Sequence, residues 1–397
     1  MNPHLNSLQP YPFQKLANLL AGVKPASPPK PINLSIGEPK HATPDFIREA
    51  LTGHLSGLSS YPATAGAESL RRAIAAWIQQ RFAVRDIDPL RQVVPVNGSR
   101  EALFAFAQAV IDTSGPRPVV VSPNPFYQIY EGAALLAGAQ TEFLNGFPEN
   151  GFAFDPSQLP AETWSRTQLI YVCSPANPTG NVMTLADWEN LFRLSDRHGF
   201  VIASDECYSE IYFSEGHAPL GGLEAAARLG RTDFRRLVAF SSLSKRSNVP
   251  GMRSGFVAGD AGILEKFLLY RTYHGCAMNP AVQAASEVAW RDETHVQENR
   301  RLYREKFEKV AAILSGVAEI NLPQAAFYLW LRTPIPDPEF AKRLFNQYNV
   351  TVLPGSFLAR QARGVNPGEN FVRIALVASV EECVEAAHRL REFFLAI

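Results

Sequence analysis

Cysteine is scarce in this chain, and neither sign of charge is in excess. Its 397 residues include four cysteines, and no two of these have the spacing of a C-x-x-C motif. This argues against a disulfide framework and favours buried, reduced thiols. The 38 basic and 38 acidic residues cancel and are interspersed along the chain. We therefore expect neither nucleic acid nor an anionic membrane surface as a partner.

Long apolar runs and several catalytic patterns are also missing. No apolar run is long enough to span a bilayer, and the first residues lack the basic and apolar regions of a signal peptide. A cytoplasmic protein is therefore expected. The G-x-S-x-G motif of serine hydrolases does not occur, and no pair of carboxylates resembles a hydrolase dyad. The histidines are scattered without metal-ligand spacing, so we expect no metal site.

Apolar residues, in contrast, are plentiful and fall into alternating short and longer segments. They make up 46% of the sequence, which is enough for a large core, and the length favours two domains. Short β-like runs alternate with helical patterns, which predicts an α/β fold with a mostly parallel central sheet covered by helices. We expect strands at residues 93–96, 118–122, 169–173, 200–204, 237–240, 326–331 and 371–376, and helices at residues 99–110, 184–198, 263–270, 281–290, 294–314, 338–349 and 379–394.

The same pattern suggests where the domains divide. A large domain is predicted at residues 45–285. The N-terminal arm at residues 1–44 and the segment at residues 286–397 would form a smaller α/β domain. The long, charged, amphipathic segment at residues 294–314 fits a helix that links the two domains. Residues 24–31 are rich in proline and are expected to be extended.

One segment, residues 241–255, concentrates side chains suited to catalysis. Lys245 lies among hydroxyl groups directly after a short apolar run. A lysine amine attacks a carbonyl well only when it is uncharged, and a nearby cation such as Arg253 favours that form. Arg253, Ser242, Ser244 and backbone N–H groups of the loop suit a phosphate. A lysine beside a phosphate cradle is what a pyridoxal 5'-phosphate (PLP) site needs, although a solvated basic loop has the same composition.

Further polar groups follow two apolar strands. Asp205 and Tyr208 come directly after the predicted strand at residues 200–204, and Asn177 follows the strand at residues 169–173. In open α/β sheets, ligands bind beyond the carboxyl ends of the strands. There, a carboxylate can hold a proton on the pyridine nitrogen of PLP, while Tyr208 and Asn177 can donate to its phenolate oxygen. The ordinary alternatives are a helix N-cap for Asp205 and a turn residue for Asn177.

Three local details accompany these groups. The Asn177–Pro178 peptide bond is a candidate for the cis geometry. Glu206 is expected to point away from Asp205, because side chains alternate at the end of a strand. Ser99 is a plausible N-cap of the helix at residues 99–110, whose N-terminus would then face an anion.

The order of these motifs resembles that of a known family. The chain is similar to the fold-type I, PLP-dependent aminotransferases of the aspartate aminotransferase class, and the resemblance covers nearly the whole chain. That family has a large domain with a mostly parallel sheet and a smaller α/β domain. The matching motifs are Ser35-Ile36-Gly37-Glu38-Pro39, Tyr61-Pro62, Asn97-Gly98-Ser99, Asn177-Pro178-Thr179-Gly180, Asp205-x-x-Tyr208, Lys245 and Arg373.

The resemblance implies a role for each matching residue. Lys245 is the Schiff-base lysine and proton shuttle, and Asp205 pairs with the pyridine nitrogen. Arg373 takes the α-carboxylate of the substrate bidentately, together with Asn177 and Gly37. The remaining cofactor-binding positions are Tyr127, stacked on the ring, Asn177 and Tyr208 at the phenolate oxygen, and Ser99, Arg100, Ser242, Ser244 and Arg253 at the phosphate. The resemblance also implies a homodimer with shared active sites, in which Tyr61 reaches the phosphate of the neighbouring subunit's cofactor.

Within the class, several strings look like the succinyldiaminopimelate aminotransferases of lysine biosynthesis. They lie at residues 11–16, 35–41, 242–253 and 271–276. This resemblance implies glutamate as amino donor, 2-oxoglutarate as its product and N-succinyl-2-amino-6-oxopimelate as acceptor. Candidate anchors for the distal end of the substrate are Lys40, Arg271 and His274. The open alternatives are a general aspartate or alanine aminotransferase, a PLP-dependent lyase on the same fold, and a PLP-binding regulator, which would normally need a DNA-binding segment.

Overall fold

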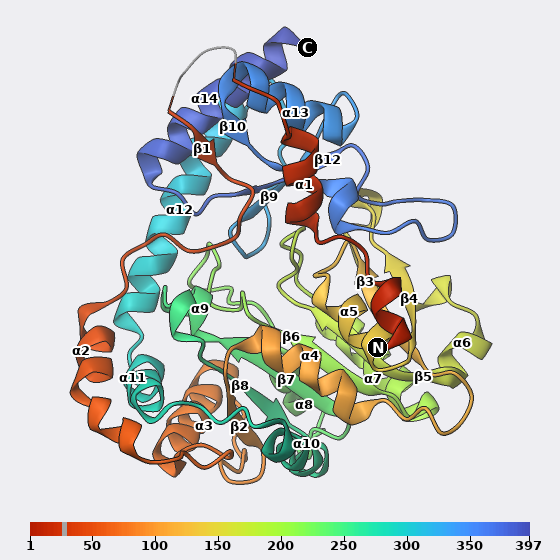
Figure 1. Ribbon diagram of the computed structural model, residues 1–397, viewed down its shortest axis with the longest axis vertical. Coiled ribbons are helices and arrows are strands. Elements are labelled where there is room, and N and C mark those ends of the chain that lie inside the picture. Colours follow the sequence, from red (N-terminus) through yellow and green to blue (C-terminus); the bar gives the residue numbers. More distant parts are fainter. Residues whose placement is uncertain (26–29) are drawn as a thin grey trace.

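A seven-stranded sheet forms the centre of the larger part of the molecule (Figure 1). The computed structural model describes residues 1–25 and 30–397. The strands lie in the order β2 (Val93–Val96), β8 (Gly255–Gly259), β7 (Leu237–Ser242), β6 (Val201–Asp205), β5 (Thr167–Cys173), β3 (Val119–Asn124) and β4 (Gln140–Asn145). β8 is antiparallel to both neighbours, and the other pairs are parallel. The predicted α/β fold with a mostly parallel sheet is confirmed.

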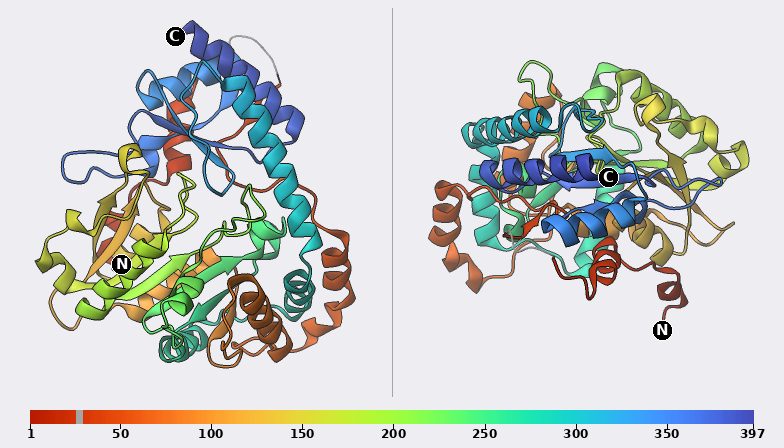
Figure 2. Two further views of the ribbon diagram at one scale, coloured as in Figure 1. Left: turned by 180° about the vertical axis from the view of Figure 1, so that it is seen from behind. Right: turned by 90° about the horizontal axis from the view of Figure 1, so that it is seen from above.

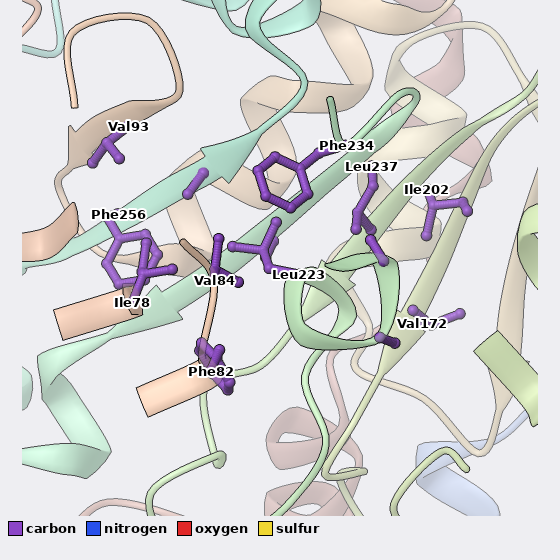
Figure 3. Close-up of a cluster of buried hydrophobic side chains, with 14 of the residues drawn as sticks. Ile78, Phe82, Val84, Val93, Val172, Ile202, Leu223, Phe234, Leu237 and Phe256 are labelled. Carbon is purple, nitrogen blue, oxygen red and sulfur yellow. The ribbon is translucent and has the colours of Figure 1, made fainter. Parts of the chain in front are cut away.

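The central strands are apolar on both faces because helices cover both sides of the sheet. Successive residues of a strand point to opposite faces. Ile170 and Val172 therefore join one buried cluster, while Leu169 and Tyr171 join another. The first cluster is closed by α3 (Glu68–Phe82), α7 (Leu185–His198), α8 (Gly222–Arg228) and α11 (Pro280–Arg291), and part of it is drawn in Figure 3. The second is closed by α4 (Ser99–Val110), α5 (Ile129–Leu136) and α10 (Ala261–His274).

A second, smaller core lies in the C-terminal part of the chain. It contains an antiparallel sheet in the order β11 (Leu353–Pro354), β12 (Phe371–Ala375), β9 (Tyr328–Arg332), and a parallel pair of β1 (Ile32–Asn33) and β10 (Val350–Thr351). The helices α12 (Thr294–Leu314), α13 (Asp337–Tyr348) and α14 (Val380–Ala396) pack on these strands. Because β1 belongs to this core, the N-terminal segment is tied to the C-terminal half of the chain.

The long helix α12 runs from the larger part of the molecule to the smaller one (Figures 1 and 2). Its bounds are those expected from the amphipathic pattern at residues 294–314. Helix α1 (Pro12–Leu20) lies beside the C-terminal strands, whereas α2 (Asp45–Gly53) packs on α11. Short helices α6 (Ala161–Arg166) and α9 (Leu243–Arg246) complete the α-helices of the described residues. Ala289 and Trp290, near the end of α11, belong to the core of the larger part, and the division into two domains at residues 45 and 286 stays a prediction.

Helix α4 has a different N-cap from the one expected. Ser99 is not the N-cap of α4 but its first residue, and Gly98, with φ +84°, occupies the N-cap position. A left-handed backbone of this kind suits glycine, which explains why the chain turns one residue earlier.

The prediction of an extended segment at residues 24–31 falls in part on residues 26–29, which lie outside the described residues. No helix within residues 1–25 and 30–397 is long and apolar enough to cross a membrane.

Candidate active site

A cavity of about 470 Å³ opens at the carboxyl ends of the central strands, between the sheet and the N-terminal segment. The structure brings eleven of the predicted site residues to its wall. They are Gly37, Ser99, Arg100, Tyr127, Asn177, Asp205, Tyr208, Ser244, Lys245, Arg253 and Arg373. β5, β6 and β7 are parallel, so the segments that follow them meet at one edge of the sheet. The volume is in the range that suits small-molecule sites, roughly 300–1,000 Å³.

Lys245 lies in the one-turn helix α9, directly after β7. The Ser242 side chain caps this turn by accepting a hydrogen bond from the Ser244 N–H at 3.1 Å. Burial is the main cause that lowers the pKa of the Lys245 amine, and the guanidinium groups of Arg253 and Arg100 lower it further. A depressed pKa raises the fraction of neutral amine, which is the nucleophilic and basic form.

Asp205 is the last residue of β6 and is almost fully buried. Its Oδ2 atom accepts a hydrogen bond from the Tyr130 hydroxyl at 2.7 Å, and Oδ1 accepts one from the Cys207 N–H at 3.3 Å. The chain turns after Asp205 rather than beginning a helix, so the N-cap interpretation does not apply. The carboxylate is therefore held at the floor of the cavity with its orientation defined by two donors.

Glu206 faces away from the cavity, as expected from the alternation along the strand. Its Oε1 atom accepts hydrogen bonds from the Ser204 hydroxyl and the Gly222 N–H, both at 2.8 Å. Burial raises the pKa of this carboxyl to about 7. Glu206 therefore helps to hold α8 against the sheet.

Cationic and hydroxyl groups gather at the N-terminus of α4. Ser99 and Arg100 form its first turn, and Arg253 approaches the same point from the segment before β8. Gly98 makes this approach possible, because a Cβ atom there would collide with the Arg253 guanidinium. No carboxylate of the described residues forms a salt bridge with Arg100 or Arg253. Two such cations at a helix N-terminus make a suitable site for a phosphate.

Arg373 lies on β12 across the cavity from this cradle. Its Nη1 donates to Asn177 Oδ1 at 3.0 Å, and its Nη2 donates to the carbonyl of Ser35 at 2.7 Å. The guanidinium carbon lies 4.5 Å from the centroid of the Tyr328 ring. Its Nε atom is buried without a hydrogen-bond partner. A buried guanidinium with a spare donor, facing a cavity, suits a carboxylate ligand.

The sequence model of the family described as aminotransferase class I and II matches residues 29–390. The chain belongs to this family. An aminotransferase from Neisseria meningitidis Z2491 shares its fold with a TM-score of 0.96 at 52% identity, over 99% of this chain and 100% of that one. Aminotransferase AspB from Helicobacter pylori 26695 gives a TM-score of 0.91 at 34% identity, over 98% and 100%. The LL-diaminopimelate aminotransferase of Nitratidesulfovibrio vulgaris (strain Miyazaki F) is 32% identical over 97% of both chains.

Members of this aminotransferase family use pyridoxal 5'-phosphate, and the residues present fit that group. The cradle at α4 offers cations for a phosphate, and the Asp205 carboxylate, in the cavity wall, would serve as partner for a protonated ring nitrogen. Tyr127 also lines the cavity, and its hydroxyl accepts a hydrogen bond from Arg100 Nε at 2.6 Å. A second cationic point, at Arg373, is left for a substrate carboxylate.

Two tyrosines near the cavity were not found from the sequence. Tyr130, on α5, orients Asp205 and stacks on Tyr171 with ring centroids 4.6 Å apart. Tyr328, on β9, shares a 2.9 Å hydrogen bond between its hydroxyl and that of Tyr208. In the sequence, only the position of Tyr130, about one helical turn after Tyr127, could have pointed to this residue. For Tyr328 the pattern indicated only an apolar strand.

Gly37 and Asn177 both line the cavity, and their roles toward substrate and cofactor stay predictions. A side chain at Gly37 would collide with the Tyr328 hydroxyl, so the backbone there runs close to the cavity. Asn177 follows β5, and its peptide bond to Pro178 is cis, as expected. Ser242 is the exception among the cofactor residues, because it is buried behind Ser244 and does not line the cavity.

The remaining predicted residues lie outside this cavity. Tyr61 is fully exposed, and Lys40 is exposed as well. The expectation that Arg271 is a free anchor for substrate is wrong. Arg271 is fully buried, and its Nη1 atom donates to both carboxylate oxygens of Glu101 at 2.7 and 3.0 Å. His274, at the exposed end of α10, also lies near Glu101.

Proposed function

We propose that this aminotransferase exchanges an amino group between an α-amino acid and a 2-oxo acid, with Lys245, Asp205 and Arg373 as its central residues. The observation that carries the proposal is that these three side chains line one cavity from three different elements, α9, β6 and β12. An amine with a lowered pKa, a buried carboxylate and a guanidinium with a spare donor are the groups that the reaction requires.

Each residue then has a defined task. PLP, when bound, supplies an electrophilic carbon and a ring that accepts electrons from the substrate α-carbon. Arg373 and Asn177 bind the substrate α-carboxylate, which orients the α-hydrogen. The Lys245 amine holds the cofactor until substrate arrives, and Nζ then takes the α-proton. Asp205 keeps a proton on the ring nitrogen, and its own orientation comes from Tyr130.

The remaining groups of the cavity hold the cofactor in this proposal. The cradle of Ser99, Arg100, Ser244 and Arg253 binds the phosphate, and Ser242 supports it by capping α9. Tyr127 packs on the face of the ring. Tyr208 and Asn177 donate hydrogen bonds to the phenolate oxygen. This division of labour leaves Arg373 free for substrate.

The test of the reaction class is a single half-reaction. Adding glutamate to the holoenzyme without an oxo acid should convert the absorbance of the lysine-bound cofactor to that of the amine form. Steady-state kinetics with both substrates should be of the ping-pong type. Release of ammonia or pyruvate from an amino acid, with no amine form, would instead indicate a lyase. A lack of either reaction would contradict the proposal.

We further propose that the amino donor is glutamate and the acceptor is N-succinyl-2-amino-6-oxopimelate. The support is the set of sequence strings at residues 11–16, 35–41, 242–253 and 271–276, together with relatives whose names refer to diaminopimelate. A second candidate, LL-diaminopimelate itself as donor, is favoured by those names.

The substrate proposal is tested by a panel of acceptors and donors. We expect kcat/KM to be highest for the succinylated acceptor, compared with oxaloacetate, pyruvate and the N-acetyl analogue. A preference for oxaloacetate or pyruvate would indicate a general aspartate or alanine aminotransferase. Faster conversion of LL-diaminopimelate with 2-oxoglutarate would favour the second candidate. If Lys40→Ala and His274→Ala leave the preference unchanged, the distal end of the substrate is held elsewhere.

Replacing Arg373 by alanine should weaken amino-acid binding strongly. Loss of one partner of a buried, hydrogen-bonded charge pair costs about 2–5 kcal/mol, so KM for glutamate should rise by about 30-fold or more. Arg373→Lys should recover only part of this loss, because lysine lacks the two-pronged donor geometry. Arg332→Ala, an exposed arginine on the neighbouring strand β9, is the matched control. An unchanged KM in Arg373→Ala would remove the residue from its role.

We also propose a homodimer in which Tyr61 reaches the cofactor phosphate of the neighbouring subunit. Its fully exposed ring follows a segment that also exposes Leu55 and Leu58, which suits a surface that another chain covers. Sedimentation should show an active dimer. Tyr61→Phe should weaken PLP binding by roughly tenfold to a hundredfold, the range for a hydrogen bond to a charged group. An active monomer would contradict the shared site.

A further inference from the structure

A hydrogen-bonded network of the half-buried His41 and the buried Asn299 and Lys306 connects the N-terminal segment to the backbone of Lys245. Lys306 Nζ lies 2.6 Å from His41 Nε2, and His41 Nδ1 lies 2.7 Å from Asn299 Oδ1. Asn299 Nδ2 in turn donates to the main-chain carbonyl of Lys245 at 3.1 Å and to that of Arg246 at 3.5 Å. Lys306 and Asn299 both lie on α12, the helix that joins the two parts of the molecule.

With Lys306 protonated, the direction of every hydrogen bond in this network follows. A protonated lysine can only donate, so His41 accepts at Nε2 and carries its proton at Nδ1. Asn299 must then accept at Oδ1 and donate at Nδ2, which is the group that faces the two carbonyls. Asn248 Nδ2 donates to the same Oδ1 at 3.1 Å. The arrangement requires a neutral histidine, and burial lowers the pKa of His41 to about 4.

The path from His41 through Asn299 to Lys245 joins two segments that line the cavity, one at Gly37 and one at Lys245. His41 follows Gly37 in the same segment, separated from it by only three residues. At the other end, α9 is a single turn, so its last carbonyls have no partner within the helix. Asn299 supplies that partner. Thr43 adds a parallel link, because its hydroxyl donates to the carbonyl of Asn248 at 2.9 Å.

Lys306 is an unusual residue to bury at this point. It is 1% exposed, and no carboxylate of the described residues forms a salt bridge with it. Its Nζ lies 4.9 Å from the centroid of the Tyr303 ring and 3.5 Å from the carbonyl of Val377. Burial lowers its pKa to about 8. A buried lysine without an acidic partner is costly, so its presence here argues for a function beyond packing.

We infer that His41, Asn299 and Lys306 are positioning residues, which hold the backbone of Lys245 at a set distance from the substrate-facing segment at Gly37. The inference rests on the proposed function, because it assigns the network to the residue that moves the proton. None of the three lines the cavity, so they act on the reaction through Lys245. A displacement of the lysine by even about 1 Å can cost roughly a hundredfold in rate.

The decisive variant is Asn299→Asp in the holoenzyme. Aspartate keeps the oxygen that accepts from His41 and Asn248, but it replaces the donor that faces the Lys245 carbonyl by a second oxygen. We expect the pH midpoint of the absorbance of the lysine-bound cofactor to shift by on the order of half a unit, because the amine moves relative to its neighbours. We expect kcat for the glutamate half-reaction to fall about tenfold, with KM changed by less than about twofold.

Two further variants complete the experiment. Gln297→Ala, on the exposed side of α12, is the matched control and should leave the spectral midpoint and kcat unchanged. His41→Asn removes the ring but leaves Asn299 in place, and should change both quantities in the same direction by a smaller factor. If Asn299→Asp fails to fold, His41→Asn decides the matter by itself.

The possible outcomes distinguish a failure of the positioning role from a failure of the proposed function. A folded Asn299→Asp or His41→Asn with the wild-type midpoint and kcat would overturn the positioning role while leaving the proposed function intact. A rise in KM alone would also overturn it, since this would indicate an effect on substrate binding only. A wild-type holoenzyme without any half-reaction would overturn the proposed function, and the positioning role with it.

Discussion

Replacing Lys245 by alanine should leave a folded protein that still binds PLP but does not turn over. The Lys245 amine is the only lysine nitrogen that lines the cavity among the described residues, so nothing replaces its nucleophile or its base. Loss of proton transfer alone removes about 10²–10⁴-fold in rate, and loss of the covalent step adds to this. Activity should therefore fall to the background of the assay.

The measurement pairs an absorbance spectrum with single-turnover kinetics. We expect Lys245→Ala to lack the absorbance of the lysine-bound cofactor, while PLP still co-purifies because the phosphate cradle is intact. Lys342→Ala, an exposed lysine on α13, should behave like the wild type. Normal absorbance together with normal turnover in Lys245→Ala would remove this residue from its role. Thermal unfolding should be unimpaired, because removal of a buried amine leaves no unpaired charge behind.

Replacing Asp205 should be nearly as damaging, for an electrostatic reason. Without a carboxylate beside it, the ring nitrogen loses its proton and the ring becomes a poor acceptor of electrons. We expect Asp205→Ala to lower kcat by roughly 10²–10³-fold, the range for loss of one preorganised charge contact. Asp205→Asn should be similarly inactive although its amide oxygen can still accept from the Cys207 N–H and its NH2 group can donate to the Tyr130 hydroxyl oxygen, which would assign the defect to the charge.

Glu206→Gln is the matched control for Asp205. The two carboxyl groups are adjacent in sequence, equally buried, and directed to opposite faces of the sheet. Glutamine still accepts from Ser204 and Gly222, so the variant should fold and react normally. Wild-type turnover in Asp205→Asn would contradict the role of the charge. A similar loss in Glu206→Gln would show that both substitutions act through the packing of β6.

The local sequence pattern was sufficient to predict the cavity residues that follow the strands. Asp205 and Asn177 come directly after runs of buried residues, and the carboxyl ends of parallel strands meet at one edge, so their convergence on one cavity was predictable. Lys245, directly after β7, was predictable for the same reason. The exact start of α4 was not predictable from this pattern, because Gly98 takes the N-cap position with a left-handed backbone, φ +84°, that the apolar pattern does not record.

Contacts between segments that are far apart in the sequence could not be predicted from the local sequence pattern. Tyr130 and Asp205 are 75 residues apart, and Tyr208 and Tyr328 are 120 apart. A strand or helix pattern shows which face of an element is apolar, but it does not show which polar group lies opposite. For the same reason Arg271 looked available as an anchor. Its partner Glu101 lies 170 residues away and binds its Nη1 atom, while its Nη2 atom donates to the carbonyl of Cys276.

The sequence by itself determined the family, the alternation of strands and helices, and the chemical types of the residues at the strand ends. These properties depend on neighbours within a few residues, which periodicity and motif order record. Only the tertiary structure decided that Arg373 meets Ser35 and Asn177, and that Lys306, His41 and Asn299 reach the carbonyl of Lys245. Those contacts join segments 54 to 338 residues apart, and they exist only because packing of α12 and β12 brings the two ends of the chain to the same cavity.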